Sequence, residues 1–91
     1  MGGDCLNYGC VPSKALIKSA KLAHQMRHGS RYGLNDTPVT PDFKAMMQRV
    51  QQVIADIAPH DSVERYTSLG VDVLQGYATL VNPWTVQIAL N

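Results

Sequence analysis

The chain's two cysteines constrain its fold more than any other feature, because they lie five positions apart where a helix is about to begin. In a regular helix, residues five apart are rotated by about 140°, so their sulfurs do not meet. A disulfide needs Cα atoms within about 7 Å, so Cys5 and Cys10 can pair only if residues 6–9 form a distorted turn. Asn7 and Gly9 permit such a turn. Three interpretations follow: two small apolar side chains that are buried, half of a metal site, or a redox-active disulfide.

The surroundings of Cys10 favour a reactive thiol. Cys10 lies at the expected N-terminal end of a helix, where unpaired N–H groups and the helix dipole favour a thiolate. Lys14 follows four residues later and therefore shares its helical face. A disulfide that closes so short a loop constrains the unfolded chain little, so a purely structural purpose is weak.

A zinc-binding module is the alternative. Cys5, Cys10, His24 and His28 have the spacing C-x4-C-x13-H-x3-H, which falls within the general pattern of tetrahedral zinc sites. Against it, a continuous helix would carry His24 about 20 Å along its axis from the cysteines.

Composition excludes several classes of function. The chain has 91 residues and a formal net charge of +1, which gives no field strong enough to recruit nucleic acid or an anionic membrane surface. No apolar run approaches the roughly 18 residues of a membrane span, and no signal peptide is recognisable. We therefore expect a cytoplasmic protein, in which two cysteines serve redox chemistry or metal binding more often than structure.

The first two thirds of the sequence predict helices. Pro12 suits the first turn of a helix over 12–28, whose core-facing residues would be Leu16, Ala20 and Ala23. Gly, Ser, Asn, Asp and Pro make residues 29–40 a loop. A second helix over 42–57, capped by Asp42, carries one apolar stripe: Phe43, Met46, Met47, Val50, Val53, Ile54 and Ile57. A short third helix is expected over 61–69, with Gly70 at its end.

The last third predicts strands over about 71–75, 78–82 and 85–90, the last two joined as a hairpin through "NPW". The predicted class is therefore α/β. Helices followed by so few strands are an unusual inventory for a complete domain, because two helices need a fuller sheet to cover.

At residues 2–15, "GGDCLNYGCVPSKA" resembles the redox-active segment of the flavin-dependent pyridine nucleotide-disulfide oxidoreductases, written G-G-T-C-x-N-x-G-C-x-P-S-K. The ending "VPSK" is more similar to lipoamide dehydrogenase and mercuric reductase than to glutathione reductase. The resemblance implies that residues 1–91 are an internal piece of a Rossmann-like FAD-binding domain, with two of the three strands of its meander.

The resemblance also implies roles for individual residues. Cys5 matches the interchange thiol that attacks the substrate, and Cys10 matches the charge-transfer thiol against the flavin. Asp4 departs from the usual threonine, and a carboxylate beside a cofactor phosphate is unfavourable unless it is paired. The cofactor-binding residues that the resemblance implies are Gly3, Asp4, Cys10 and Lys14, and, at the adenine end of FAD, Gly76, Tyr77 and Ala78.

The function implied for the parent enzyme passes electrons from NAD(P)H through FAD to the Cys5–Cys10 pair, and then to a small-molecule disulfide or to mercuric ion. The sequence shows no G-x-G-x-x-G motif, and the start at Met1 has the character of a cut. For the parent, the resemblance implies a homodimer. For the isolated fragment, we expect no activity, little or no FAD binding, and self-association through the stripe of 43–57 and the open edge of 85–90. A non-catalytic interaction fragment is a further alternative.

Overall fold

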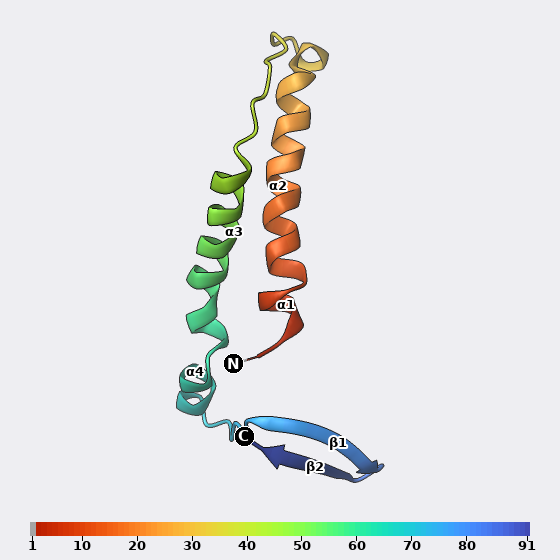
Figure 1. Cartoon of the computed structure of the whole chain (residues 1–91), viewed down its shortest axis with the longest axis vertical. Helices are drawn as coiled ribbons and strands as arrows, with labels where there is room; N and C mark the ends of the chain where they lie inside the picture. Colours follow the sequence, from red (N-terminus) through yellow and green to blue (C-terminus); the bar gives the residue numbers. More distant parts are fainter. Residues whose placement is uncertain (1) are drawn as a thin grey trace. The chain divides into compact units, whose positions relative to one another are not determined.

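The computed structural model describes residues 2–91, which form two compact units, residues 2–58 and residues 59–91 (Figure 1). Each unit is described by itself. The first contains the helices α1, α2 and α3 and the 3₁₀ turn η1, and the second contains the short helix α4 and a two-stranded sheet. The α/β class is confirmed, whereas the Rossmann assignment stays a prediction.

Helix α2 spans Cys10–Arg27 and packs side by side with α3, which spans Phe43–Ile57 (Figure 1). The observed start at Cys10 lies two residues before the predicted one, because the chain already turns helical at the second cysteine and Pro12 occupies the first turn. The expected core face of this helix needs one correction: Ala20 is exposed, and Ala15 is buried in its place. The small Ala15 allows α3 to approach closely.

The stripe of α3 is confirmed at its centre and wrong at its start. Val50 is only 2% exposed, and the other members of the stripe after Phe43 are half-buried. Phe43, in contrast, is 71% exposed. Phe43 is the first residue of α3, seven positions before the buried Val50.

A compact loop connects α2 to α3. It begins with η1 (Gly29–Tyr32), and Gly29 is buried so tightly that an added Cβ would lie 3.0 Å from the carbonyl oxygen of Asn35. The Thr37 N–H donates to the Met26 carbonyl over 2.8 Å, which returns the chain along α2. The Ser30 N–H donates to the Asp36 carboxylate over 2.7 Å. Hydrogen bonds rather than an apolar core therefore hold this loop.

The second unit begins with η2 (Ala58–Asp61), which starts one residue before the unit boundary, and α4 (Val63–Ser68). Helix α4 is shorter than the predicted 61–69, because the Ser62 side chain caps it by accepting from the Arg65 N–H and so sets the first helical residue at Val63. Gly70 follows with φ 88°, as a helix end requires.

The sheet is an antiparallel hairpin of β1 (Gly76–Asn82) and β2 (Thr85–Leu90), with an irregularity between Leu80 and Asn82. The strand predicted over 71–75 is wrong: this segment forms no strand in the described chain. A strand exists only when its backbone pairs with a neighbour. The ladder instead begins at Gly76, two residues earlier than the predicted 78–82, because Gly76 pairs with Leu90.

Within residues 2–91, no helix combines the length and the apolar character that crossing a bilayer would require.

Asp42 should stabilise α3 as its N-cap, because its carboxylate accepts from the Ala45 N–H over 3.0 Å. We expect Asp42→Ala to lower the free energy of unfolding by about 1 kcal/mol and Asp42→Asn to preserve most of it. Chemical denaturation followed by circular dichroism measures the difference. Asp72→Ala, which removes an exposed carboxylate from the other unit, is the matched control. An equal loss in both variants would contradict the cap.

The loop after α2 should lose stability in acid. Hydrogen bonding from Ser30 lowers the pKa of Asp36 below its ordinary value. A carboxyl group whose folded pKa is depressed stabilises the fold above its unfolded pKa, and this contribution disappears as the pH falls through the folded pKa. NMR titration of the Asp36 carboxyl carbon should give a midpoint below the ordinary pKa of an aspartate. Asp36→Asn should abolish the acid-dependent shift of the Ser30 amide, and its persistence in that variant would refute the assignment.

Candidate functional site

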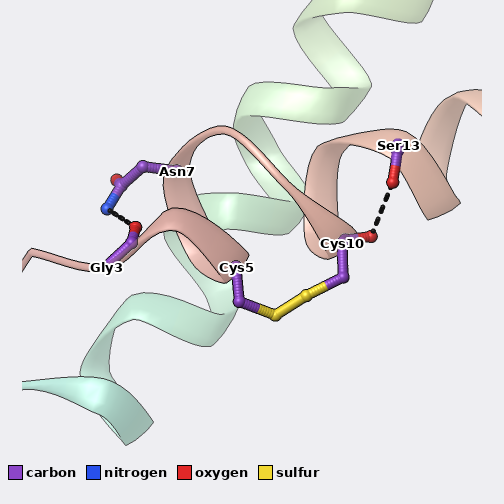
Figure 2. Close-up of a disulfide and its surroundings, with 5 residues drawn as sticks. All are labelled: Gly3, Cys5, Asn7, Cys10 and Ser13. Atoms are coloured by element: carbon purple, nitrogen blue, oxygen red, sulfur yellow. Dashed lines mark hydrogen bonds between the residues drawn. A yellow bond between two sulfur atoms is a disulfide. The ribbon is translucent and has the colours of Figure 1, made fainter.

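The two cysteines are brought together by a break between two helices. The short helix α1 (Asp4–Asn7) is followed by a turn at Tyr8 and Gly9, and α2 begins directly at Cys10. Cys5 and Cys10 are joined as a disulfide, with their Cα atoms 4.8 Å apart (Figure 2). This separation lies within the range that a disulfide allows. The distorted turn that the sequence requires is thus one turn of helix followed by a sharp change of direction.

Backbone bonds fix this change of direction. The Asp4 carbonyl oxygen accepts from the Tyr8 N–H over 2.8 Å and also from the Gly9 N–H. A Cβ on Gly9 would lie 3.0 Å from that same oxygen, so glycine allows the loop to close on itself. The glycine between the two cysteines is therefore a requirement of the loop's packing.

Side chains support both ends of the loop. Asn7 donates from Nδ2 to the Gly3 carbonyl over 3.0 Å, and the Ser13 hydroxyl donates to the Cys10 carbonyl over 3.3 Å (Figure 2). Leu6, next to the first cysteine, is buried at 7% exposure. The buried Leu6 side chain therefore anchors the loop, and hydrogen bonds within the loop satisfy its polar groups.

The two cysteines differ in accessibility. Cys5 is exposed, and Cys10 is half-buried at the N-terminal end of an 18-residue helix. Because thiol–disulfide exchange depends on which sulfur an attacking thiolate can reach, the exposed cysteine is the more accessible partner for a molecule from solution. Lys14 is exposed one turn further along α2, on the helical face of Cys10.

The other predicted cofactor residues lie elsewhere in the chain. Gly76, Tyr77 and Ala78 are consecutive residues of β1, in the second compact unit. A Cβ on Gly76 would clash with the carbonyl oxygen of Ala89, so the pairing of the two strands by itself accounts for this glycine. Tyr77 is 78% exposed.

The structure gives the zinc alternative no support. In the described part of the chain, no three histidine, cysteine or acidic side chains gather as a metal site would require. Both cysteines are committed to the disulfide. The two histidines stack on each other with ring centroids 4.2 Å apart, and the Nδ1 of His28 bonds to the His24 carbonyl over 2.7 Å.

Sequence reasoning missed one contact near this site. The Nη1 of Arg49, on α3, donates to the carbonyl oxygen of Ala15, on α2, over 3.1 Å. Arg49 lies outside the apolar stripe and belongs to no motif. In the sequence, only its neighbour Val50 indicates that Arg49 lies near the core.

The sequence is similar to segments of known oxidoreductases. The chain is 36% identical over 88 residues to the dihydrolipoyl dehydrogenase of Chlamydia muridarum, an alignment that covers 96% of this chain and 18% of that protein. It is 34% identical over 84 residues to the dihydrolipoyl dehydrogenase of Bacillus subtilis, covering 91% of this chain and 17% of the relative. It is 34% identical over 95 residues to the mercuric reductase of Streptomyces lividans, covering 99% of this chain and 19% of the relative. No protein-family profile matches the sequence.

The chain belongs to the class I pyridine nucleotide-disulfide oxidoreductases. It corresponds to one segment of that family, since it spans less than one fifth of the length of the relatives above. The resemblance drawn from residues 2–15 is thereby confirmed, and it extends over nearly the whole chain. For this chain, the roles of Cys5, Cys10 and the cofactor-binding residues remain predictions.

Gly9→Ala should loosen the disulfide loop, because its methyl group must displace the Asp4 carbonyl by a few tenths of an ångström. We expect the melting temperature to fall and the disulfide to be reduced by dithiothreitol several-fold faster than in the unsubstituted chain. Gly2→Ala is the matched control, since an added Cβ there meets nothing within 4 Å. Identical reduction rates for both variants would show that the close approach at Gly9 does not support the loop.

Proposed function

We propose that this chain is the redox-disulfide segment of an FAD-dependent NAD(P)H:disulfide or mercuric ion oxidoreductase. The observation that supports this proposal most directly is the Cys5–Cys10 disulfide at the N-terminus of α2. It occurs in a chain whose relatives are named dihydrolipoyl dehydrogenase and mercuric reductase.

The residues around the disulfide fit a flavin. Gly3 has φ 113°, a conformation that side chains rarely adopt, and an added Cβ there would meet nothing within 4 Å, so the backbone is open to a ligand. Cys10 is partly exposed, and the Lys14 ammonium lies on its face of α2, where it would favour electron-rich atoms of the ring. Gly3, Asp4, Cys10 and Lys14 are thus the proposed contacts near the flavin.

The proposed adenine contacts rest on the resemblance. Tyr77 is exposed and free to stack on a planar ring, and Ala78 follows it on the strand. The pairing of β1 with β2 already requires glycine at position 76. A contact of Gly76 with the cofactor therefore rests on the resemblance alone.

When bound, FAD would accept a hydride from NAD(P)H and supply two electrons to the disulfide. With two protons, these electrons convert the Cys5–Cys10 bond into two thiols. The exposed Cys5 thiolate then attacks a substrate disulfide, forming a mixed disulfide and releasing one thiolate. Cys10 attacks the sulfur of Cys5, which closes the protein disulfide and releases the second thiolate. Each exchange is reversible, so the same atoms serve the oxidation of a dithiol.

A mercuric acceptor would use the same two sulfurs differently. Thiolates are the protein ligands that soft metal ions prefer, so the reduced pair could bind Hg²⁺ as a substrate. We propose a small-molecule acceptor of one of these two classes, a cytoplasmic location and a homodimeric parent. For the isolated chain we propose self-association without catalysis and with little or no affinity for FAD.

The assignment of the two cysteines can be tested in the full-length parent protein. Two-electron reduction should produce a long-wavelength absorbance band that arises from a thiolate lying against the flavin. Cys10→Ser should abolish this band. Cys5→Ser, which has no disulfide to open, should show the band before any reductant is added, because its Cys10 thiolate is proposed to face the oxidised ring. Stopped-flow absorbance measures both variants. A band that survives in Cys10→Ser, or that is absent from unreduced Cys5→Ser, would contradict the assignment.

A further inference from the structure

A single side chain ties α3 to the early turns of the cysteine-bearing helix α2. The Nη1 of Arg49 donates to the Ala15 carbonyl over 3.1 Å, across 34 positions of sequence, at a partly buried site. Ala15, whose carbonyl accepts the bond, is 6% exposed, and Val50, the residue after Arg49, is 2% exposed. The bond therefore lies beside buried apolar side chains of both helices.

Helix α3 contacts both helices that carry a cysteine. It packs against α1, which holds Cys5, as well as against α2, which begins at Cys10. Figure 2 shows the green ribbon of α3 behind the disulfide loop. Leu6, next to the first cysteine, is buried as well. Helix α3 is thus a shared support for the two halves of the disulfide.

This support matters most when the disulfide is open. The tendency of two thiols to form a disulfide depends on how well the protein keeps them close, and after reduction no covalent bond between the sulfurs does so. The 4.8 Å separation of the cysteine Cα atoms must then be kept by the loop itself and by the common packing on α3.

We propose that Arg49 is a positioning residue for the redox pair, which keeps the early turns of α2 seated on α3 so that Cys10 stays within reach of Cys5. It acts through the Ala15 carbonyl and contacts neither sulfur. This inference rests on the proposed function, because it assigns a role in the closing step of the same disulfide. A guanidinium suits the task, since a charge-assisted bond from a planar fork holds its geometry better than a flexible ammonium does.

Electrostatics alone would predict the opposite effect of removing Arg49. Its side chain and that of Lys14 line the same pocket beside Val11, the residue that follows Cys10. A cation near the thiols favours the thiolate and hence the reduced state, so losing the charge would favour the disulfide. Losing a positional restraint would disfavour the disulfide. The sign of the change therefore separates the two effects.

The experiment equilibrates the full chain with mixtures of reduced and oxidised glutathione, traps free thiols by alkylation and counts them by mass spectrometry. We expect Arg49→Met to lower the equilibrium constant for disulfide formation by roughly three- to tenfold, the range that one partly exposed charged hydrogen bond provides. Arg49→Lys should recover part of the loss. Lys44→Met, which removes an exposed cation elsewhere on α3, should leave the constant unchanged.

Three results would overturn the inference: an unchanged constant in Arg49→Met, a constant that rises, or an equal fall in Lys44→Met. Thermal unfolding is recorded in parallel, because a lower melting temperature with an unchanged glutathione equilibrium indicates a structural role only and also refutes the proposal. Should Arg49→Met fail to fold, Arg49→Gln takes its place, and a constant in Arg49→Gln equal to that of the unsubstituted chain refutes the proposal. Failure here leaves the charge-transfer test of Cys10 unaffected, so the two proposals fail separately.

Discussion

The packing of α3 against both α1 and α2 is the interaction on which the helical unit depends. Each of the three helices contributes one buried apolar side chain to it, namely Leu6, Ala15 and Val50. A core of this size is small, because burial of a leucine or valine side chain contributes only about 1.5–3 kcal/mol and burial of the methyl group of Ala15 contributes less. The disulfide and the bond from Arg49 to Ala15 therefore act where the apolar core is thin. The site is held by a few specific links, and each of them is open to substitution.

The second unit, residues 59–91, lacks such a core. Both strands of the hairpin are exposed almost throughout, and Trp84 and Tyr77 are 90% and 78% exposed. An isolated two-stranded hairpin is marginally stable in water, and unpaired edges invite pairing with further strands. The relatives are more than five times as long as this chain. We therefore expect the apolar faces of the hairpin to be covered in the parent protein.

Local signals in the sequence predicted the helices well and the strands less well. Asp42, Pro12 and Gly70 act within one turn of chain, so the ends that they mark fall within two residues of the structure. The predicted strand at 71–75 depends on a partner elsewhere, which no pattern within five residues specifies. The short helix α1 was missed because four residues are too few for a helical period. The spacing of the cysteines required a distorted turn and so anticipated the site, whereas the contact of Arg49 depends on how two helices cross.

The division of labour proposed for the two cysteines has a physical basis in the lengths of their helices. Cys10 begins a helix of 18 residues that is packed along α3, so its sulfur has a fixed position from which it can face a bound ring. Cys5 lies in a helix of four residues, held by Leu6 and by the bond from Asn7 to Gly3. A helix this short has few internal hydrogen bonds, so once the disulfide is reduced the position of α1 depends on its packing against α3. In the proposed function, the exposed Cys5 thiol meets the substrate while Cys10 keeps its position through the packing of α2 on α3.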